Sequence, residues 1–183
     1  MTDLLPAYNP VRQVPGRFWA LVPCAGTGTR ALRVQPGAAA VLPKQYQAVA
    51  GQPMVLHTLA AFAGVARLAG TLVAVAPGDD FFAGHAHPGF FAVPCGGATR
   101  ADTVLGGLKA LQARGALDDD WVLVHDAARC LVTTALIDAL IDACQHDGVG
   151  GLLAHKLADT LKTASDGPGG VRVAATVDRS DKW

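Results

Sequence analysis

Glutamate is absent from this sequence of 183 residues, so all fifteen acidic residues are aspartates. This excludes mechanisms that require a glutamate, including that of the H-E-x-x-H metalloproteases. Serine occurs only at Ser165 and Ser180, and neither lies in the G-x-S-x-G pattern, so a serine hydrolase is excluded as well. The four cysteines form no C-x-x-C pair, which indicates thiols that are not cross-linked, in a reducing compartment.

Charge is also scarce in this chain. Charged residues make up 16% of it with a formal sum of zero, whereas hydrophobic residues make up 51%. This composition predicts a folded globular domain and gives no sign of a nucleic-acid partner. No apolar run is long enough to predict a membrane span, and the first residues lack the order of a signal peptide. We therefore expect a cytoplasmic protein that binds neither nucleic acid nor membrane.

Strand-like and helix-like segments alternate along the chain. The segments that read as strands are 18–23, 71–77, 90–95 and 121–129. The segments that read as helices are 53–70, 100–114 and 133–148. This alternation predicts an α/β fold, with a Rossmann-like, mostly parallel sheet flanked by helices.

The pattern changes at residue 150, where two β-like runs surround a turn rich in glycine. They predict a protruding β-hairpin arm, whose exposed edges favour a partner. We accordingly expect three parts: a flexible leader (1–16), a nucleotide-binding α/β core (17–149) and a β-arm for dimerisation that returns to the core (150–183).

A glycine-rich segment follows the first predicted strand. Residues 26–31, Gly-Thr-Gly-Thr-Arg-Ala, meet the G-x-G-x-x-G/A pattern of dinucleotide-binding folds. Such a site also requires an acidic residue about 20 positions later, yet no aspartate occurs between Gly28 and Gly78. Pro36 and Pro43 interrupt the helix that the pattern requires, and no G-K-[ST] closes a Walker A loop. The sequence therefore does not predict a dinucleotide site.

Basic residues follow these glycines instead, at Arg30, Arg33 and Lys44. Backbone N–H groups of a G-x-G turn can hold a polyphosphate while arginine and lysine neutralise its charge. This predicts a polyphosphate site with Arg30 and Lys44 as its cations. A tight turn with incidental surface cations stays open as an alternative.

Asp126 lies in the charged part at the end of the predicted buried strand 121–129. Ligands of open α/β sheets bind at the carboxyl ends of the strands, and Mg²⁺ prefers one or two carboxylates together with phosphate oxygens. The position predicts a magnesium ligand, and Arg129 either completes an anion pocket or pairs with Asp126. An aspartate that caps the next turn is the alternative.

A third segment, Gly96 to Thr103, combines two glycines with the start of a predicted helix. Gly96 and Gly97 allow close backbone approach to a flat ligand, and Arg100 and Thr103 are one helical turn apart. Backbone groups and a hydroxyl could hold a pyrimidine, or the segment is an ordinary loop with a capped helix.

Three other features are assigned no function. His85 and His87 lie in a Gly/Pro loop without a third ligand, so we expect them to be solvated. Residues 118–120, three aspartates, are expected to form a solvated turn. Cys24 has no partner histidine and is expected to be a small residue that allows close approach rather than a nucleophile.

Six motifs occur in a characteristic order between about Phe18 and Trp183: VPCAGTGTR, PKQY, GGATRADTVLGGL, VHDAAR, DTLK and TVDR. In these motifs the chain resembles the 2-C-methyl-D-erythritol 4-phosphate cytidylyltransferase family of the non-mevalonate isoprenoid pathway. The resemblance implies that CTP and methylerythritol phosphate react to give the CDP-linked alcohol and pyrophosphate. It also implies Mg²⁺ as the metal and a homodimer built through the hairpin arm.

The resemblance further implies roles for matching positions. Arg30 and Lys44 match the catalytic residues that grip the phosphates, and Asp126 matches the metal-coordinating aspartate. The positions that match nucleotide-binding residues are Ala25, Gly26, Gly28, Gly97, Arg100, Thr103 and Ala127. The positions that match binders of the sugar phosphate are Arg129 and, from the neighbouring subunit, Thr160 and Arg179.

The chain also departs from the family pattern. Residues 31–43 form a longer connection than usual, which would be mobile without ligand, and Lys182 replaces an apolar residue. The chain stops at Trp183, where relatives continue into a part that holds another phosphate-binding lysine. Two alternatives therefore stay open: a cytidylyltransferase for another polyol phosphate such as ribitol 5-phosphate, and a truncated, non-catalytic module that binds nucleotide or dimerises.

Overall fold

The computed structural model describes residues 16–26 and 42–183 of the chain. They form two compact units, which divide after Gly150. Within the described part of the chain, no helix combines the length and the apolar character that crossing a membrane requires.

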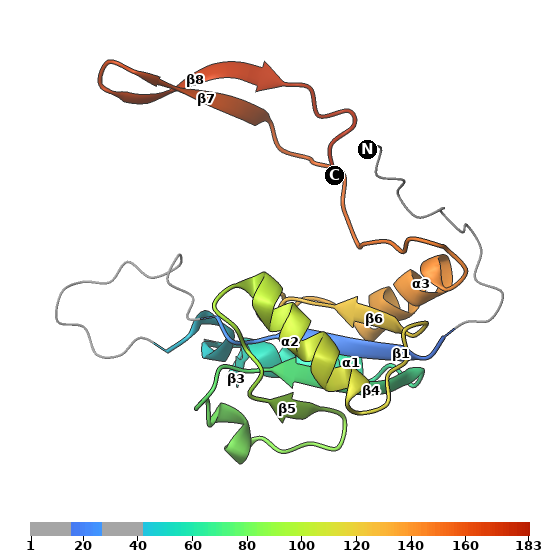
Figure 1. The fold of residues 1–183 in the computed structure, drawn as a ribbon. Helices are drawn as coiled ribbons and strands as arrows, with labels where there is room; N and C mark the ends of the chain where they lie inside the picture. The colour runs from blue at the N-terminus through green and yellow to red at the C-terminus, as the bar shows by residue number, and fades with distance from the viewer. Residues whose placement is uncertain (1–15, 27–41) are drawn as a thin grey trace, which may run out of the picture. The chain divides into compact units, whose positions relative to one another are not determined.

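The first unit is built on a four-stranded parallel sheet with the order β5-β4-β1-β6 (Figure 1). The strands are β1 (Phe18–Pro23), β4 (Leu68–Ala74), β5 (Phe91–Val93) and β6 (Trp121–Val124). β1 is parallel to β4 along its whole length and to β6 along its first four residues. Because the chain adds β4 and β5 on one side of β1 and then β6 on the other, the strand order reverses at β1.

Helices cover both faces of this sheet, as in the predicted Rossmann-like α/β class. They are α1 (Met54–Ala63), α2 (Arg100–Gln112) and α3 (Thr134–Cys144). Phe18 and Ala20 of β1 pack with residues of α1 and α3, whereas Trp19 and Leu21 pack with α2. Successive side chains of a strand point to opposite faces, so the continuous apolar run of β1 is buried from both sides.

Four short elements complete the first unit. They are the 3₁₀ helices η2 (Lys44–Tyr46) and η3 (Phe81–Gly84) and the antiparallel strands β2 (Ala48–Val49) and β3 (Gln52–Pro53). The turn between β2 and β3 places Ala50 and Gly51 at positive φ, as tight hairpins require. The sequence patterns did not predict this two-residue pairing, because it is too short to show a period.

Several predicted boundaries are wrong. The helix predicted over 53–70 ends at Ala63, and β4 begins at Leu68, because Leu68 pairs with Phe18 of β1 and joins the sheet. The strand predicted over 121–129 ends at Val124, and beyond it the His125 N–H still donates to the Leu21 carbonyl. This strand was expected to be buried, but its residues are only half-buried or exposed, because in the described chain β6 has a neighbour on one side only.

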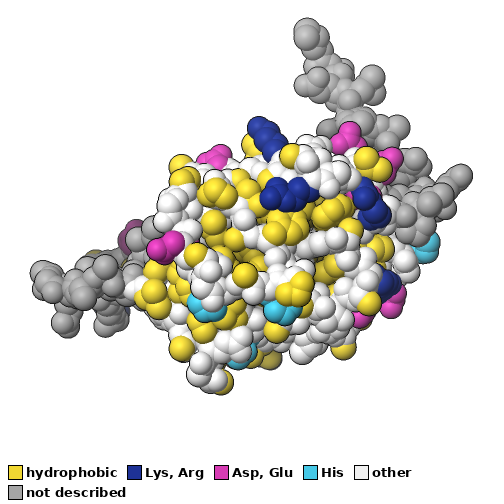
Figure 2. Space-filling model, turned by 90° about the horizontal axis from the view of Figure 1, so that it is seen from below, with side chains coloured by type: hydrophobic (Ala, Val, Ile, Leu, Met, Phe, Trp, Pro, Cys, Tyr) yellow, Lys and Arg dark blue, Asp and Glu magenta, His cyan; other side chains and the backbone are white. Residues whose placement is uncertain are grey.

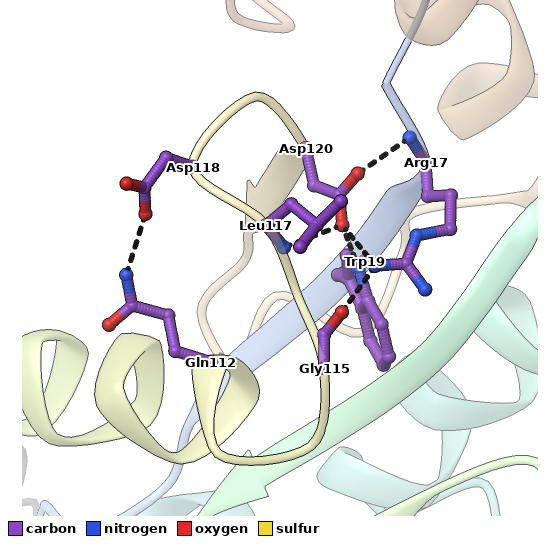
Figure 3. A network of polar contacts seen from close by, with 7 residues as sticks. All are labelled: Arg17, Trp19, Gln112, Gly115, Leu117, Asp118 and Asp120. Carbon is purple, nitrogen blue, oxygen red and sulfur yellow. Dashed lines mark hydrogen bonds and ion pairs between the residues drawn. The ribbon is translucent and has the colours of Figure 1, made fainter.

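The prediction of a solvated turn at 118–120 is wrong for Asp120 (Figure 3). Its side chain is only 4% exposed and accepts hydrogen bonds from Arg17, Trp19 and Leu117. Burial by itself would raise the pKa of this carboxyl, but hydrogen bonds from Leu117, Trp19 and Arg17 outweigh it and lower the pKa to about 2. Asp120 therefore links the start of β1 to the segment before β6, at the amino ends of the strands.

Apolar side chains remain abundant on the surface as well. On the face in Figure 2 they far outnumber charged side chains, as the low charge content of the sequence implies. A cavity of about 410 Å³ is lined by residues of η3, β5 and the segments beside them, including Asp79, Phe82, His87 and Phe90.

The second unit is an antiparallel hairpin of β7 (Leu161–Gly167) and β8 (Gly170–Val177), as predicted. Gly169 and Gly170 adopt positive φ at its tip. A bulge between Thr163 and Ala164 shifts the register, and most side chains of both strands are exposed. At its base the backbone N–H of Leu157 donates to the carbonyl of Lys182 at 3.0 Å.

Candidate active site

The carboxyl ends of the strands bring together segments that are far apart in the sequence. Ala25 and Gly26 follow β1, Asp126 and Ala127 follow β6, and Gly97 follows β5. A sheet whose strand order reverses binds ligands in the crevice outside the carboxyl ends at the reversal, which here falls between β1 and β6. Gly26, the first residue of the predicted loop, and the predicted carboxylate therefore lie at the same edge of the sheet.

Asp126 is held between two arginines. Arg100 Nη2 lies 2.8 Å from Asp126 Oδ1, and Arg129 Nε donates to Oδ2 at 2.7 Å. The carboxylate is 35% exposed. Its burial would raise the pKa, but the hydrogen bonds from Arg129 and Arg100 lower the pKa below its ordinary value. Asp126 is therefore ionised at neutral pH, and Arg129 pairs with it in this structure. A further role of Arg129 in an anion pocket stays a prediction.

The two glycines before α2 approach neighbouring groups too closely for a side chain. A Cβ on Gly96 would come within 2.3 Å of the Ala25 Cβ, and one on Gly97 within 2.3 Å of the Asp102 Cβ. The Gly97 N–H donates to Thr103 Oγ1 at 3.1 Å, and this buried hydroxyl donates in turn to the Thr99 carbonyl at 3.0 Å. Gly97 and Thr103, two of the predicted nucleotide-binding residues, are thus in contact, and Thr103 holds the loop.

Lys44 begins η2 and its side chain is exposed. The next residue, Gln45, is buried and donates from Nε2 to the carbonyls of Cys24 and Gly26, at 3.0 and 2.9 Å. This contact joins the predicted lysine to the predicted loop through a residue that received no role in the sequence analysis. Gly28 and Arg30, the other predicted residues of the loop, lie outside the described residues.

Thr58 is a second residue that the sequence analysis missed. This fully buried residue of α1 donates from Oγ1 to the carbonyl of Ala127 at 3.0 Å, and so holds the segment that carries Asp126. A lone threonine in an apolar helix carries no signal of this role, whereas Gln45 at least lies within the PKQY motif.

Cys24 is buried and does not have the properties of a nucleophile. Burial raises the pKa of its thiol to about 12, although a hydrogen bond with Tyr46 opposes the shift. The Tyr46 hydroxyl donates to Asp79 Oδ2 at 2.6 Å, and the Tyr46 ring stacks on Phe81 at 4.0 Å. This agrees with the expectation that Cys24 is a small structural residue beside the loop.

Thr160 and Arg179 belong to the second unit. They lie on the two sides of the hairpin base, since Leu161 pairs with Val177. Arg179 donates from Nη1 to the carbonyl of Ala158, so its guanidinium is tied to the base of its own hairpin.

A metal at Asp126 would depend on a bound phosphate. Among the described residues, no three His, Cys or Asp side chains cluster closely enough to hold a metal ion. One ionised carboxylate suits Mg²⁺ when phosphate oxygens and water supply its remaining ligands. The side chains at this site therefore fit Mg²⁺ that is bound together with phosphate, once at least one of the two arginines no longer pairs with Asp126.

The strand reversal, the closely packed glycines beside it and the ion pairs of Asp126 are typical of a nucleotide-binding α/β protein. Comparison with known proteins narrows this class. Residues 18–183 match the family model of 2-C-methyl-D-erythritol 4-phosphate cytidylyltransferase. The chain belongs to this family of nucleotidyltransferases.

Curated relatives agree with this assignment. The bifunctional enzyme IspD/IspF of Albidiferax ferrireducens is 57% identical over 97% of this chain, which spans 40% of that relative. The 2-C-methyl-D-erythritol 4-phosphate cytidylyltransferase of Paraburkholderia phytofirmans is 50% identical over 91% of this chain, which spans 68% of that relative.

Solved structures share the fold. A crystal structure of 4-diphosphocytidyl-2C-methyl-D-erythritol synthase is 33% identical, with a TM-score of 0.74 over 92% of this chain and 71% of the other. The corresponding cytidylyltransferase of Francisella tularensis is 25% identical, with a TM-score of 0.66 over 92% of this chain and 69% of the other.

Proposed function

We propose that this chain transfers the cytidylyl group of CTP to 2-C-methyl-D-erythritol 4-phosphate and releases pyrophosphate. The observation that carries the proposal is the strand reversal at β1, where Ala25, Gly26 and Asp126 follow two neighbouring strands of a chain that belongs to this family. The names of the relatives support the identity of the alcohol phosphate.

The reaction requires positioning and charge stabilisation rather than a side-chain base. An oxygen of the alcohol phosphate attacks the α-phosphorus of CTP, and the bond from this phosphorus to the oxygen that bridges to the β-phosphorus breaks. The attacking phosphate is already an anion, so no proton has to be removed. Cations and backbone N–H groups that neutralise the developing charge are therefore sufficient.

The side chains divide this work as follows in our proposal. Arg30 and Lys44 neutralise the phosphates, and backbone groups of Ala25, Gly26 and Gly28 hold them. Gly97, Arg100, Thr103 and Ala127 form the nucleoside end of the site. Mg²⁺, when bound at Asp126 with phosphate oxygens, supplies additional positive charge.

The alcohol phosphate would bind to Arg129 and, from a neighbouring subunit, to Thr160 and Arg179. This arrangement requires a homodimer formed through the hairpin of β7 and β8. The exposed strands of that hairpin support the idea, because unpaired edges favour association. We place the reaction in the cytoplasm, in keeping with the uncross-linked cysteines of the described chain.

Pyrophosphate release from this 183-residue chain tests the proposal, with CTP, Mg²⁺ and methylerythritol phosphate as substrates. We expect release, and we expect Lys44→Ala to lower kcat/KM by at least about a hundredfold, because a cation on the transferring phosphates is lost. Lys109→Ala on α2 is the matched control, since Lys109 is another exposed lysine, and it should retain wild-type turnover.

Two results would contradict the proposal. Pyrophosphate release with ribitol 5-phosphate but not with methylerythritol phosphate would show that the chain uses a different polyol phosphate. Binding of CTP in calorimetry without any release would show a nucleotide-binding module that does not catalyse transfer.

A further inference from the structure

The side chain of Gln45 is a buried polar group that spans two parts of the nucleotide site. It is 7% exposed, and its Nε2 donates to the Cys24 carbonyl at 3.0 Å and to the Gly26 carbonyl at 2.9 Å. Both hydrogens of one amide group are thereby used on the first residues after β1. A buried amide with two such partners is a strong constraint on the backbone that it contacts.

The direction of these hydrogen bonds determines which way the backbone N–H groups face. The described chain has no cis peptide bonds, and in a trans peptide the C=O and the following N–H point in opposite directions. Because the Cys24 carbonyl points to Gln45, the Ala25 N–H points away from it. Within the described residues, the N–H groups of Ala25 and Gly26 have no hydrogen-bond acceptor.

Among the described residues, nothing covers Gly26. It is exposed, and an added Cβ there would meet none of their atoms within 4 Å. A backbone N–H group that faces an open space is available to bind an anion. The amide of Gln45 holds the Cys24 carbonyl on one side and leaves the Ala25 N–H on the other side for phosphate.

Gln45 is itself held rigidly. The neighbouring Tyr46 is buried, donates its hydroxyl to Asp79 and stacks on Phe81. The Tyr46 N–H also donates to the Pro43 carbonyl at 2.9 Å, which closes η2. Lys44 precedes Gln45 in this short helix, so the same anchor limits where the lysine can reach.

We infer that Gln45 is a positioning residue for the triphosphate of the nucleotide: it holds the backbone of Cys24 and Gly26, orients the backbone donor of Ala25 and keeps Lys44 beside it. This inference rests on the proposed function, because it takes CTP as the ligand. Neither glutamate nor asparagine can replace Gln45. A carboxylate would face two carbonyl oxygens without a hydrogen to donate, and the shorter amide would not span both contacts.

Gln45→Glu tests this inference, with Gln47→Glu as the matched control. Gln47 undergoes the same chemical change two residues away, where, within the described residues, its side-chain amide makes one exposed contact of 3.3 Å, to Leu42. Calorimetry measures the Kd of CTP with Mg²⁺, and steady-state kinetics measures the KM of each substrate. We expect Gln45→Glu to raise the Kd and KM of CTP by about tenfold or more, with less than a twofold change in the KM of methylerythritol phosphate.

The pH dependence separates positioning from general destabilisation. As the pH falls from about 8 to about 5.5, a buried glutamate takes up a proton and can donate one hydrogen bond again. The ratio of the Kd of CTP for Gln45→Glu to the Kd for the wild type should therefore decrease as the pH is lowered. The same ratio for Gln47→Glu should stay constant. Gln45→Met, which is uncharged and of similar length, should show the same loss of CTP affinity without this pH dependence.

Three outcomes would overturn the inference. One is wild-type CTP affinity in Gln45→Glu or Gln45→Met. Another is an equal rise in the KM of both substrates, which indicates general distortion. A wild-type chain that does not bind CTP would overturn the proposed function, and the inference with it. This outcome is seen with the wild type alone, so it is distinct from a failure of the inference, which is seen only in the variants.

Discussion

Two aspartates on either side of β6 show how different environments give one residue type different roles. Asp120 precedes the strand and is buried among N–H donors. Asp126 follows the strand and pairs with two arginines whose side chains are largely exposed. An exposed ion pair contributes only about 0–1 kcal/mol, so a ligand can take an arginine from Asp126 at small cost. Asp120 has no such freedom, which indicates a structural role.

Asp120→Asn should lower the free energy of unfolding by about 1–3 kcal/mol near neutral pH. Whichever way the new amide turns, its NH₂ group faces at least one N–H donor, from Arg17, Trp19 or Leu117. Urea unfolding measures the difference. Asp118→Asn is the control, because in the described part of the chain that exposed carboxylate accepts only from Gln112. It should change stability by less than about 0.5 kcal/mol.

The same pair of variants has an expected pH dependence. The folded pKa of Asp120 is lowered from 3.8 to about 2, so its stabilisation is fully present above about pH 4 and is lost as the pH falls toward about 2. The difference between the wild type and Asp120→Asn should shrink over this range. A difference that stays constant down to about pH 2 would contradict the assigned pKa shift.

At the scale of elements, α2 shows how a local motif supports the site. Thr99 caps the helix: its side chain accepts from the Asp102 N–H, and the Asp102 side chain accepts from the Thr99 N–H. The next residue is Arg100, and one turn later Thr103 holds the Gly97 loop. The cap therefore fixes where α2 begins, and with it the positions of Arg100 and Thr103, two predicted site residues.

Thr99→Ala should destabilise the chain by about 1 kcal/mol, because the Asp102 N–H loses its capping acceptor. Thr99→Ser, which keeps the hydroxyl, should be close to the wild type. The midpoint of urea unfolding measures both. Equal midpoints for Thr99→Ala and the wild type would show that tertiary packing alone positions the start of α2.

Element prediction succeeded where the pattern was long and local. The strand Phe18–Pro23 was predicted with the bounds it has, and α2 and α3 were predicted to within a few residues at their ends. Prediction failed where a partner strand decided the outcome, as at Leu68, or where the element had only two residues, as at β2 and β3.

At the scale of the whole molecule, the second unit exposes apolar side chains that its own hairpin cannot bury. Val171 and Val173 of β8 are 72% and 67% exposed. They pair with Asp166 and Ala164 of β7, two positions apart, so they share one face of the hairpin. Such a face favours a partner, in keeping with the proposed dimer.

Replacing Val171 and Val173 together by Asp should weaken that dimer, raising its Kd by at least about tenfold, as measured by sedimentation equilibrium. Leu131→Asp is the control, because Leu131 is an exposed leucine of the first unit. It should leave association unchanged. A wild-type chain that sediments as a monomer at all concentrations would contradict the dimer itself.

The sequence alone determined the α/β class and the presence of a hairpin after residue 150, because these follow from local periodicity and from the turn chemistry of neighbouring residues. The polyphosphate loop that it also indicated stays a prediction. Only the tertiary structure decided the strand order, and with it the pairing of Asp126 with both Arg100 and Arg129. It also decided the burial of Asp120 and the contacts of Gln45 and Thr58. Each of these depends on groups that are distant along the chain, which no local pattern brings together; packing the sheet against its helices does.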